Sequence, residues 1–402
     1  MITGVGVVSP FGDSCDSFRD ALLAGRSGIR PDATFAAAGC RSTLAARVSC
    51  FEPSRWVSPM KLRRMDSTGP MALAAAQQAL DSARYVPATE GDERAGVVLG
   101  TFSAGGQATS EYLGALFRGG PTSAPALLFN STVGNAAAGL VGLEFKLRGP
   151  NLTVSHKEAS GLAALATAFD LLRHDRADGL LAGGVDAIYD LFYRTHDQFR
   201  VMADCTTVGP GTAPFSRTRR GFVLGEGAYV FWLETADRAR ARNATVHAEL
   251  LGVGASGAAV SLNAWPTCAS PIVRTMQLAL SEAGLSEDDV DVVYSSANAS
   301  PALDEVEARA LTRMFGGKRA VVTSIKGAIG EAGTSASGAI AAAVLCGALG
   351  RVPPIAGLAE PDAGVASLRV ALEAADTGGP IALVNSIGSG GALFAAVLRV
   401  AR

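Results

Sequence analysis

The chain has 402 residues, of which 48% are hydrophobic and 18% are charged, and its formal net charge is -2. This length can form about two or three hydrophobic cores of domain size. The composition excludes a disordered protein, a disulfide-stabilised mini-protein and a collagen-like fibre. Because no basic block is present, it also argues against a dedicated nucleic-acid binder. With 47 glycines and only 6% aromatic residues, the core must be built from small, closely packed side chains.

Several features favour a cytoplasmic protein. The opening MITGVGVVSPFG has neither the positive leader nor the cleavage site of a secretory signal. The longest apolar stretch, Gly338–Gly350, is too short to span a bilayer, and its alanine and glycine predict a buried helix instead. We therefore expect no membrane partner, no nucleic acid, no metal and no cofactor. The cysteines have no metal-site spacing and are expected to be buried, reduced thiols: Cys15, Cys40, Cys50, Cys205, Cys268 and Cys346.

Strand-length apolar runs alternate with segments of helical periodicity, which predicts a layered α/β protein. The first half contains an expected strand at Ile2–Val8, a helix at Met71–Ser82, strands at Ala95–Leu99 and Leu152–Ser155, a helix at Ser160–Arg173, and strands at Gly179–Ala182 and Ala228–Leu233. The second half contains a helix at Pro271–Ala283, a strand at Val290–Tyr294, a helix at Ala302–Met314, a strand at Arg319–Thr323, a helix at Gly338–Leu349, and strands at Ile381–Val384 and Leu393–Val400.

The last strand of each half follows a glycine-rich turn, GFVLGEGA in the first and NSIGSGGA in the second. This similarity indicates two related halves, 1–245 and 246–402, which meet at the basic, polar segment RARARNA. No low-complexity linker separates them, so they are expected to share one core.

Five motifs occur in a fixed order: ITGVGVVSPFG, LRGPNLTVSHKEASGLAAL, PFSRTRRGFVLGEGA, SIKGAIGEAGTSASG and the final NSIGSGGA. In this order the chain resembles the β-ketoacyl-acyl-carrier-protein synthases of fatty-acid and polyketide pathways over nearly its whole length. The resemblance implies a thiolase-like fold, which is an α/β fold of two similar halves in five alternating layers, and an obligate dimer. Members of this family join an acyl group to malonyl carried on acyl carrier protein, with loss of carbon dioxide.

The catalytic positions implied by the resemblance hold other residues here. The nucleophilic cysteine of a ketosynthase sits where a helix N-terminus lowers the thiol pKa and backbone N–H groups form an oxyanion hole. That position is Glu158 in this chain. The two histidines that polarise the malonyl thioester are replaced by Ser296 and Glu331, whereas the lysine of the second histidine motif is retained as Lys326. Condensation by this chain alone is therefore not expected.

No other residue takes over the lost chemistry. A carboxylate attacking a thioester would give a mixed anhydride, which is a poor store for a growing chain. Of the four histidines, His156 is the only one near the nucleophile position, and it is interpreted as a packing or hydrogen-bonding residue. Cys268, in WPTCASP, is expected to be an inert thiol, although it could approach the same cavity.

One branch of the family combines this fold with the loss of the cysteine. The chain length factors, or ketosynthase-β subunits, of bacterial type II polyketide synthases commonly carry glutamine at the nucleophile position. Each pairs with an active, cysteine-bearing ketosynthase and shapes the tunnel for a chain carried on the 4′-phosphopantetheine arm of acyl carrier protein. We expect the same partners here. We also expect Glu158, Glu331 and a lysine, Lys326 or Lys157, to form a closed polar cluster, because unpaired glutamates would repel and raise one pKa.

The resemblance also points to a tunnel and a gate. The tunnel helix begins with small side chains, which favours a linear, reduced or polyene product; alternatively, these residues only let two helices approach across the dimer. They are Thr132, Val133, Gly134, Ala136, Ala137 and Ala138. At the gating loop, where an aromatic residue usually guards the pocket, the chain has Ile387 and Ser389, and the Ser389 N–H is the second oxyanion donor at best.

Two alternatives remain open at this stage. The first is an enzyme of altered chemistry, either a malonyl decarboxylase or a proton-transfer catalyst that uses Glu158 and Glu331. The second is a homodimeric pseudo-synthase that only binds acyl chains or carrier protein. Independently, Asp304 and Glu307 are interpreted as buried structural carboxylates that could pair with Lys326.

Overall fold

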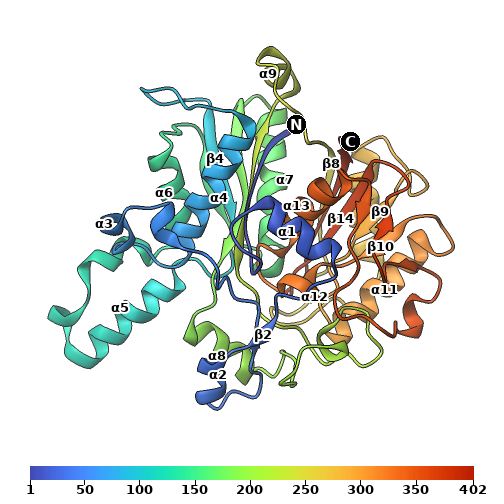
Figure 1. The fold of residues 1–402 in the computed structure, drawn as a ribbon, viewed down its shortest axis with the longest axis horizontal. Coiled ribbons are helices and arrows are strands. Elements are labelled where there is room, and N and C mark those ends of the chain that lie inside the picture. The colour runs from blue at the N-terminus through green and yellow to red at the C-terminus, as the bar shows by residue number, and fades with distance from the viewer.

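The computed structural model describes residues 1–402, and helices and strands alternate along the chain (Figure 1). The strands of the main sheet are β1 (Ile2–Val8), β4 (Ala95–Gly100), β5 (Asn151–Val154), β6 (Gly179–Asp186), β7 (Gly227–Glu234), β8 (Ala248–Gly257), β9 (Val292–Tyr294), β10 (Val321–Thr323), β12 (Arg369–Val370), β14 (Ile381–Ile387) and β15 (Ala392–Val400). Two small ribbons pair β2 (Arg30–Pro31) with β3 (Leu44–Ala45) and β11 (Arg351–Val352) with β13 (Ala375–Asp376).

The helices lie mainly on the two faces of the main sheet. They are α1 (Cys15–Leu23), α2 (Ala33–Ala37), α3 (Pro59–Leu62), α4 (Thr68–Ala83), α5 (Gly106–Gly119), α6 (Ala136–Glu144), α7 (Ser160–Arg173), α8 (Asp190–Gln198), α9 (Ala236–Ala241), α10 (Ser270–Glu282), α11 (Pro301–Phe315), α12 (Lys326–Ile329) and α13 (Ser335–Gly347). Helix α13 is buried along nearly its whole length, which confirms the buried helix predicted from the alanine-rich stretch. None of the helices is both long enough and apolar enough to span a bilayer.

The strand order of the main sheet is that of a duplicated unit. It runs β12-β10-β9-β14-β15-β8-β1-β7-β6-β4-β5. In each half the first strand (β1 or β8) pairs antiparallel with the last (β7 or β15), which pairs antiparallel with β6 or β14, and the remaining strands follow in parallel. The halves join where Ile2 pairs with Ala248. The division proposed at residues 245 and 246 lies between α9 and β8.

The elements stack in five layers. Helices α7 and α13 pack against each other in the centre, and each also contacts strands of the opposite half: α7 touches β8 and β15, and α13 touches β1 and β7. The outer layers are α4 and α6 on the first half of the sheet and α10 and α11 on the second (Figure 1). This is the thiolase-like α/β fold expected from the sequence.

Small residues make this close layering possible. A Cβ on Gly6 of β1 would lie 1.9 Å from the carbonyl oxygen of Ala75 in α4. In the second half, a Cβ on Gly254 of β8 would lie 2.2 Å from the carbonyl oxygen of Thr275 in α10. Both distances are far below van der Waals contact, so helix and strand can approach this closely only because these positions lack a side chain.

Candidate functional site

The nucleophile position lies where β5 turns into α7. A 3-10 turn, η4 (Lys157–Ala159), connects the two and leaves Glu158 buried at the start of the helix. Lys157 has a φ of 51°, a conformation that L-amino acids rarely adopt. The turn therefore holds Lys157 in a strained conformation directly before Glu158.

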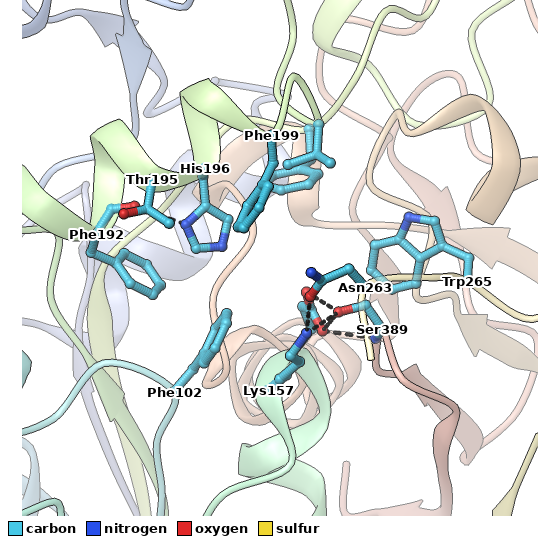
Figure 2. A pocket seen from close by; sticks show the side chains of 12 residues that line it. Phe102, Lys157, Phe192, Thr195, His196, Phe199, Asn263, Trp265 and Ser389 are labelled. Carbon is cyan, nitrogen blue, oxygen red and sulfur yellow. Dashed lines mark hydrogen bonds between the residues drawn. The ribbon is translucent and has the colours of Figure 1, made fainter. Parts of the chain in front are cut away.

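The Glu158 carboxylate is bound to Ser389 in the loop after β14. The backbone N–H of Ser389 donates to Oε2 of Glu158 at 2.8 Å, and the Ser389 hydroxyl lies 3.0 Å from both carboxylate oxygens (Figure 2). The sequence identified this N–H as the candidate oxyanion donor. The structure shows that a side chain of the same protein already uses it.

Lys157 is held beside this contact but does not form an ion pair with Glu158. Its ammonium donates to Asn263 Oδ1 at 2.8 Å, to the hydroxyl of Ser389 at 3.2 Å and to the carbonyl of Leu262. Its three protons are therefore engaged, and it reaches the carboxylate only through the Ser389 hydroxyl.

The former histidine positions form a second polar group. Lys326 and Glu331 make a buried ion pair with 2.8 Å between Nζ and Oε2. Asn298 Nδ2 donates to the same carboxylate oxygen at 2.7 Å, and Lys326 also donates to the Ser296 hydroxyl at 3.2 Å. The Ser296 hydroxyl in turn accepts from the backbone N–H of Ile387 at 3.0 Å. All these groups are buried. Lys326 connects Ser296 and Glu331 by donating a hydrogen bond to each of them.

The closed cluster expected from the sequence is thus divided into two hydrogen-bonded groups. One joins Glu158 to Ser389 and Lys157, and the other joins Glu331 to Lys326 and Ser296. Burial raises the pKa of Glu331 to about 7; Lys326 opposes this shift, and the charge of Glu158 adds to it. The expected repulsion between the two glutamates is therefore present, but it is smaller than the effect of burial.

The expectation that Asp304 or Glu307 pairs with Lys326 is wrong. Glu307 accepts from the backbone N–H of Ser296 at 2.8 Å and from Asn385 Nδ2 at 2.7 Å. Asp304 accepts backbone N–H groups, including that of Phe215 at 2.7 Å. The carboxylates of Asp304 and Glu307 therefore hold backbone N–H groups in place. The ion pair with Lys326 is formed by Glu331 instead.

The GFVLGEGA turn supports this second group from behind. The backbone N–H of Glu331 donates to the carbonyl of Val223 at 2.7 Å, and the backbone N–H of Gly225 donates to the carbonyl of Glu331 at 2.9 Å. A Cβ on Gly225 would lie 2.1 Å from the carbonyl oxygen of Ile329, so only glycine allows this approach. The turn fixes the backbone on which Glu331 stands.

A cavity of about 450 Å³ opens next to Glu158 (Figure 2). At its polar end lie Lys157, Glu158, Asn263 and Ser389. The remaining wall is mostly aromatic and consists of Phe102, Phe192, Phe199, Phe222 and Trp265, with Thr195, His196 and Val201 between them. The volume is in the range of small-molecule sites.

Sequence reasoning missed most of this wall. Phe192 and His196 come from α8, and Phe199 follows that helix, although the sequence indicated no site there. The WPTCASP stretch does contribute to the cavity, but through Trp265, whereas Cys268 is exposed and is not among the lining residues. Helical spacing of aromatic residues in LFYRTHDQF was the available signal.

Neither His156 nor Ile387 lines the cavity. His156 packs its ring against Phe394, with 5.4 Å between the ring centroids. Ile387 is fully buried in the core of the second half, so only Ser389 of the two proposed gate residues lines the cavity.

The proposed tunnel residues lie elsewhere, at the start of α6 and before it. Ala137 and Ala138 are buried against α4, whereas Val133 and Gly134 are exposed. A Cβ on Gly134 would meet only the carbonyl oxygen of Ala104, at 3.8 Å. The segment does not contribute to the cavity at Glu158, and in the isolated chain it faces open space.

Comparison with known proteins assigns the chain to one family. The chain matches the model of the beta-ketoacyl synthase N-terminal domain over residues 1–239 and that of the C-terminal domain over residues 247–359. The chain belongs to the beta-ketoacyl synthase family. It is 30% identical to the 3-oxoacyl-[acyl-carrier-protein] synthase 2 of Coxiella burnetii, over 97% of this chain and 96% of that protein.

The chain is also similar to a subunit of a polyketide synthase and to a solved ketosynthase/chain length factor. The chain is 32% identical to the tetracenomycin polyketide synthase ketoacyl synthase alpha subunit of Streptomyces glaucescens, over 90% of this chain and 88% of that one. Among solved structures, the ishigamide ketosynthase/chain length factor matches with a TM-score of 0.91 and 28% identity, covering 100% of this chain and 98% of that one.

Proposed function

We propose that this chain is a chain length factor. It would act as a non-catalytic, ketosynthase-like subunit that forms a heterodimer with an active, cysteine-bearing ketosynthase. There it would shape the tunnel for the acyl chain during type II polyketide elongation on acyl carrier protein. The carrying observation is the contact between Glu158 and Ser389: the nucleophile position holds a carboxylate, and this carboxylate occupies the N–H that an oxyanion would need.

The second polar group supports the same conclusion. Condensation requires donors that stabilise the enolate left by loss of carbon dioxide. Ser296 and Glu331 stand at those positions, and both are bound to Lys326. The fold of a ketosynthase is retained, whereas each group that would act on the substrate is replaced and satisfied within the protein.

The surface offers a place for a partner chain. Strand β5 pairs only with β4, so its other edge carries unpaired backbone groups. Beside it, Leu143 of α6 and Leu152 of β5 expose apolar surface. Helix α5 and η3 (Ala126–Ser131), which extend from the body in Figure 1, expose Phe117 and Phe129. An apolar face of this kind beside an open strand edge suits a stable dimer interface.

The tunnel would run along this face. Thr132, Val133 and Gly134 lead into α6, so they would contact an acyl chain that extends from the partner's site. Because Gly134 meets almost no neighbour, the lining would be wide there, which supports a linear, reduced or polyene product. The carrier protein with its phosphopantetheine arm would deliver malonyl and acyl groups to the partner, and a cytoplasmic location stays a prediction.

Neither alternative has comparable support. A decarboxylase would need donors that stabilise an enolate, and Ser296 and Glu331, at the positions expected to supply them, are both bound to Lys326. A proton-transfer catalyst would need Glu331 to face substrate, whereas its carboxylate is buried and bound to Lys326 and Asn298. A homodimeric acyl-binding protein differs from a chain length factor in its oligomeric state, which the experiment below measures.

Co-expression with a ketosynthase encoded beside this chain tests the proposal. We expect a one-to-one complex on size exclusion, and we expect a pantetheine-linked electrophile to label only the partner. A stable homodimer that ignores the ketosynthase would favour the acyl-binding alternative. Labelling of this chain at the cavity would restore a catalytic role.

A further inference from the structure

The cavity beside Glu158 has a wall of aromatic rings. Phe102 and Phe192 meet edge to face with 5.1 Å between their centroids, and His196 stacks obliquely on Phe192 at 4.4 Å. Phe199 extends the wall beside His196, and Trp265 lies across the cavity from them (Figure 2). Phe199 is 58% exposed, so the wall reaches the surface and a ligand can enter. The faces of such rings carry partial negative charge and attract cations.

Two polar side chains of the cavity, Glu158 and His196, have acceptor sites that no group of the protein uses. The Glu158 oxygens receive hydrogen bonds only from Ser389, and a carboxylate has about four acceptor sites, so acceptor capacity remains. Nδ1 of His196 lies 2.8 Å from the carbonyl of Phe192, so it is the protonated nitrogen and Nε2 is left as an acceptor. The Lys157 ammonium is engaged by three oxygens.

The charges of Glu158 and Lys157 both act on the His196 ring in the cavity wall. Burial lowers the pKa of His196, so the ring is neutral at pH 7. The charge of Glu158 raises this pKa, and it has a larger effect than the opposing charge of Lys157. At the His196 ring, the carboxylate of Glu158 therefore has a larger effect than the ammonium of Lys157.

We propose that this cavity binds a small organic cation with an apolar body, with its ammonium group directed at Glu158 and enclosed by Phe102, Phe192, Phe199, Phe222 and Trp265. Three independent features meet here: a buried carboxylate with unused acceptor sites, a box of aromatic rings, and a neutral imidazole that accepts hydrogen bonds. A malonyl or fatty carboxylate would be repelled by the charge of Glu158, and the donors left in the wall, Asn263 Nδ2 and Trp265 Nε1, are neutral. This ligand class goes beyond the chain length factor role and does not follow from it.

Titration calorimetry with three probes of equal length tests the proposal on the full chain, with any co-purified partner present in every arm. The probes are hexylammonium, hexan-1-ol and hexanoate. We expect hexylammonium to bind at least about tenfold more tightly than the other two. Glu158→Gln should remove this preference and leave the affinity for hexan-1-ol unchanged. Trp265→Leu should weaken the binding of hexylammonium, and Glu90→Gln, at an exposed carboxylate, should change nothing.

Several outcomes would overturn the proposal. They are equal or tighter binding of hexanoate, an unchanged preference in Glu158→Gln, and no binding of any probe. If Glu158→Gln also lost hexan-1-ol, its effect would lie in the shape of the cavity, and the proposal would fail as well. None of these results depends on heterodimer formation, so failure here leaves the proposed function untouched.

Discussion

The carboxylate of Glu158 accepts the backbone N–H of Ser389 at 2.8 Å and lies 3.0 Å from the hydroxyl of the same residue. This contact joins the two halves of the duplicated fold, because Glu158 precedes α7 and Ser389 follows β14. In a working site of this shape, the N–H would face a developing oxyanion. Here the side chain of Glu158 accepts that N–H instead.

Replacing Glu158 with glutamine should leave product formation by the complex nearly intact. The amide oxygen can still accept the Ser389 N–H, and the side chain keeps its volume. Loss of the charge-assisted part of the contact should lower the free energy of unfolding by about 1 kcal/mol or less. Product yield of the reconstituted complex and chemical denaturation measure both effects. A complete loss of product in a folded variant would instead favour direct catalysis by Glu158.

Replacing Glu158 with cysteine should restore acylation but not condensation. The thiol would lie at the start of α7, where the helix N-terminus favours the thiolate, and the Ser389 N–H would be free. We expect a mass increase of one acyl group after incubation with an acyl-pantetheine thioester. No elongated product should form, because Ser296 and Glu331 cannot replace the histidines.

Glu158→Ala is the matched control for that experiment. It frees the same N–H without supplying a thiol, so it should stay unmodified. Peptide mapping separates acylation at position 158 from reaction at the exposed thiols of Cys50 and Cys268. Condensation by Glu158→Cys alone, without a partner, would show that the second polar group is not inert.

Most of the fold was predictable because the sequence keeps regular patterns of apolar residues over many strands and helices. The strand at Ile2–Val8 and the helix at Ser160–Arg173 have the predicted bounds. Strand β8 was missed because Gly252 and Gly254 interrupt the alternation of apolar and polar residues. These glycines allow α10 to pack closely on the strand. Helix α5 was also missed, since only Ala108 of its residues is buried and its apolar side chains face outward.

The site was only partly predictable for a different reason. Glu158, Ser296 and Glu331 stand in motifs, so their positions could be read from the sequence. Their partners depend on which side chains the fold places close together. Glu331 pairs with Lys326, and Glu158 pairs with Ser389. Part of the aromatic wall, Phe192 and Phe199, has helical spacing along α8 and its C-terminal cap, but Phe102, Phe222 and Trp265 come from distant segments that only the fold brings to it.

Stability should depend on pH through Glu331. Its ordinary pKa of 4.5 is raised to about 7 by burial. The folded state therefore keeps a proton that the unfolded state loses, so this stabilising effect is complete below about pH 4.5 and is lost as the pH rises through about 7. Glu331→Gln cannot lose a proton, so its stability relative to the natural chain should rise between pH 5 and pH 7. We expect a gain on the order of 1 to 2 kcal/mol.

Denaturant titrations of both proteins at pH 5, 6 and 7 measure this difference. Asp304 and Glu307, whose pKa values burial raises to about 6 and about 7, remain in both proteins and cancel in the comparison. A difference that does not change with pH would show that Glu331 is ionised throughout this range and that the pair with Lys326 outweighs its burial.

Gly134→Phe should shorten the product of the heterodimer. A Cβ there meets almost no neighbour in this chain, so the variant should fold normally and place its ring in the proposed tunnel. Product length by mass spectrometry is the readout, and size exclusion checks that the complex still forms. An intact complex with products of unchanged length would mean that the small residues serve only the approach of two helices.

Gly6→Ala and Gly139→Ala should have opposite effects on stability. A Cβ on Gly6 would lie 1.9 Å from the carbonyl oxygen of Ala75, so β1 and α4 must separate, and we expect a loss of at least about 3 kcal/mol. Gly139 lies in the exposed face of α6 with nothing within 4 Å of an added Cβ, and alanine favours the helix there by about 0.5 to 1 kcal/mol. Thermal denaturation of the isolated chain compares the two. If Gly6→Ala were tolerated as well as Gly139→Ala, close contact between strand and helix could not be the reason for the glycine content of this core.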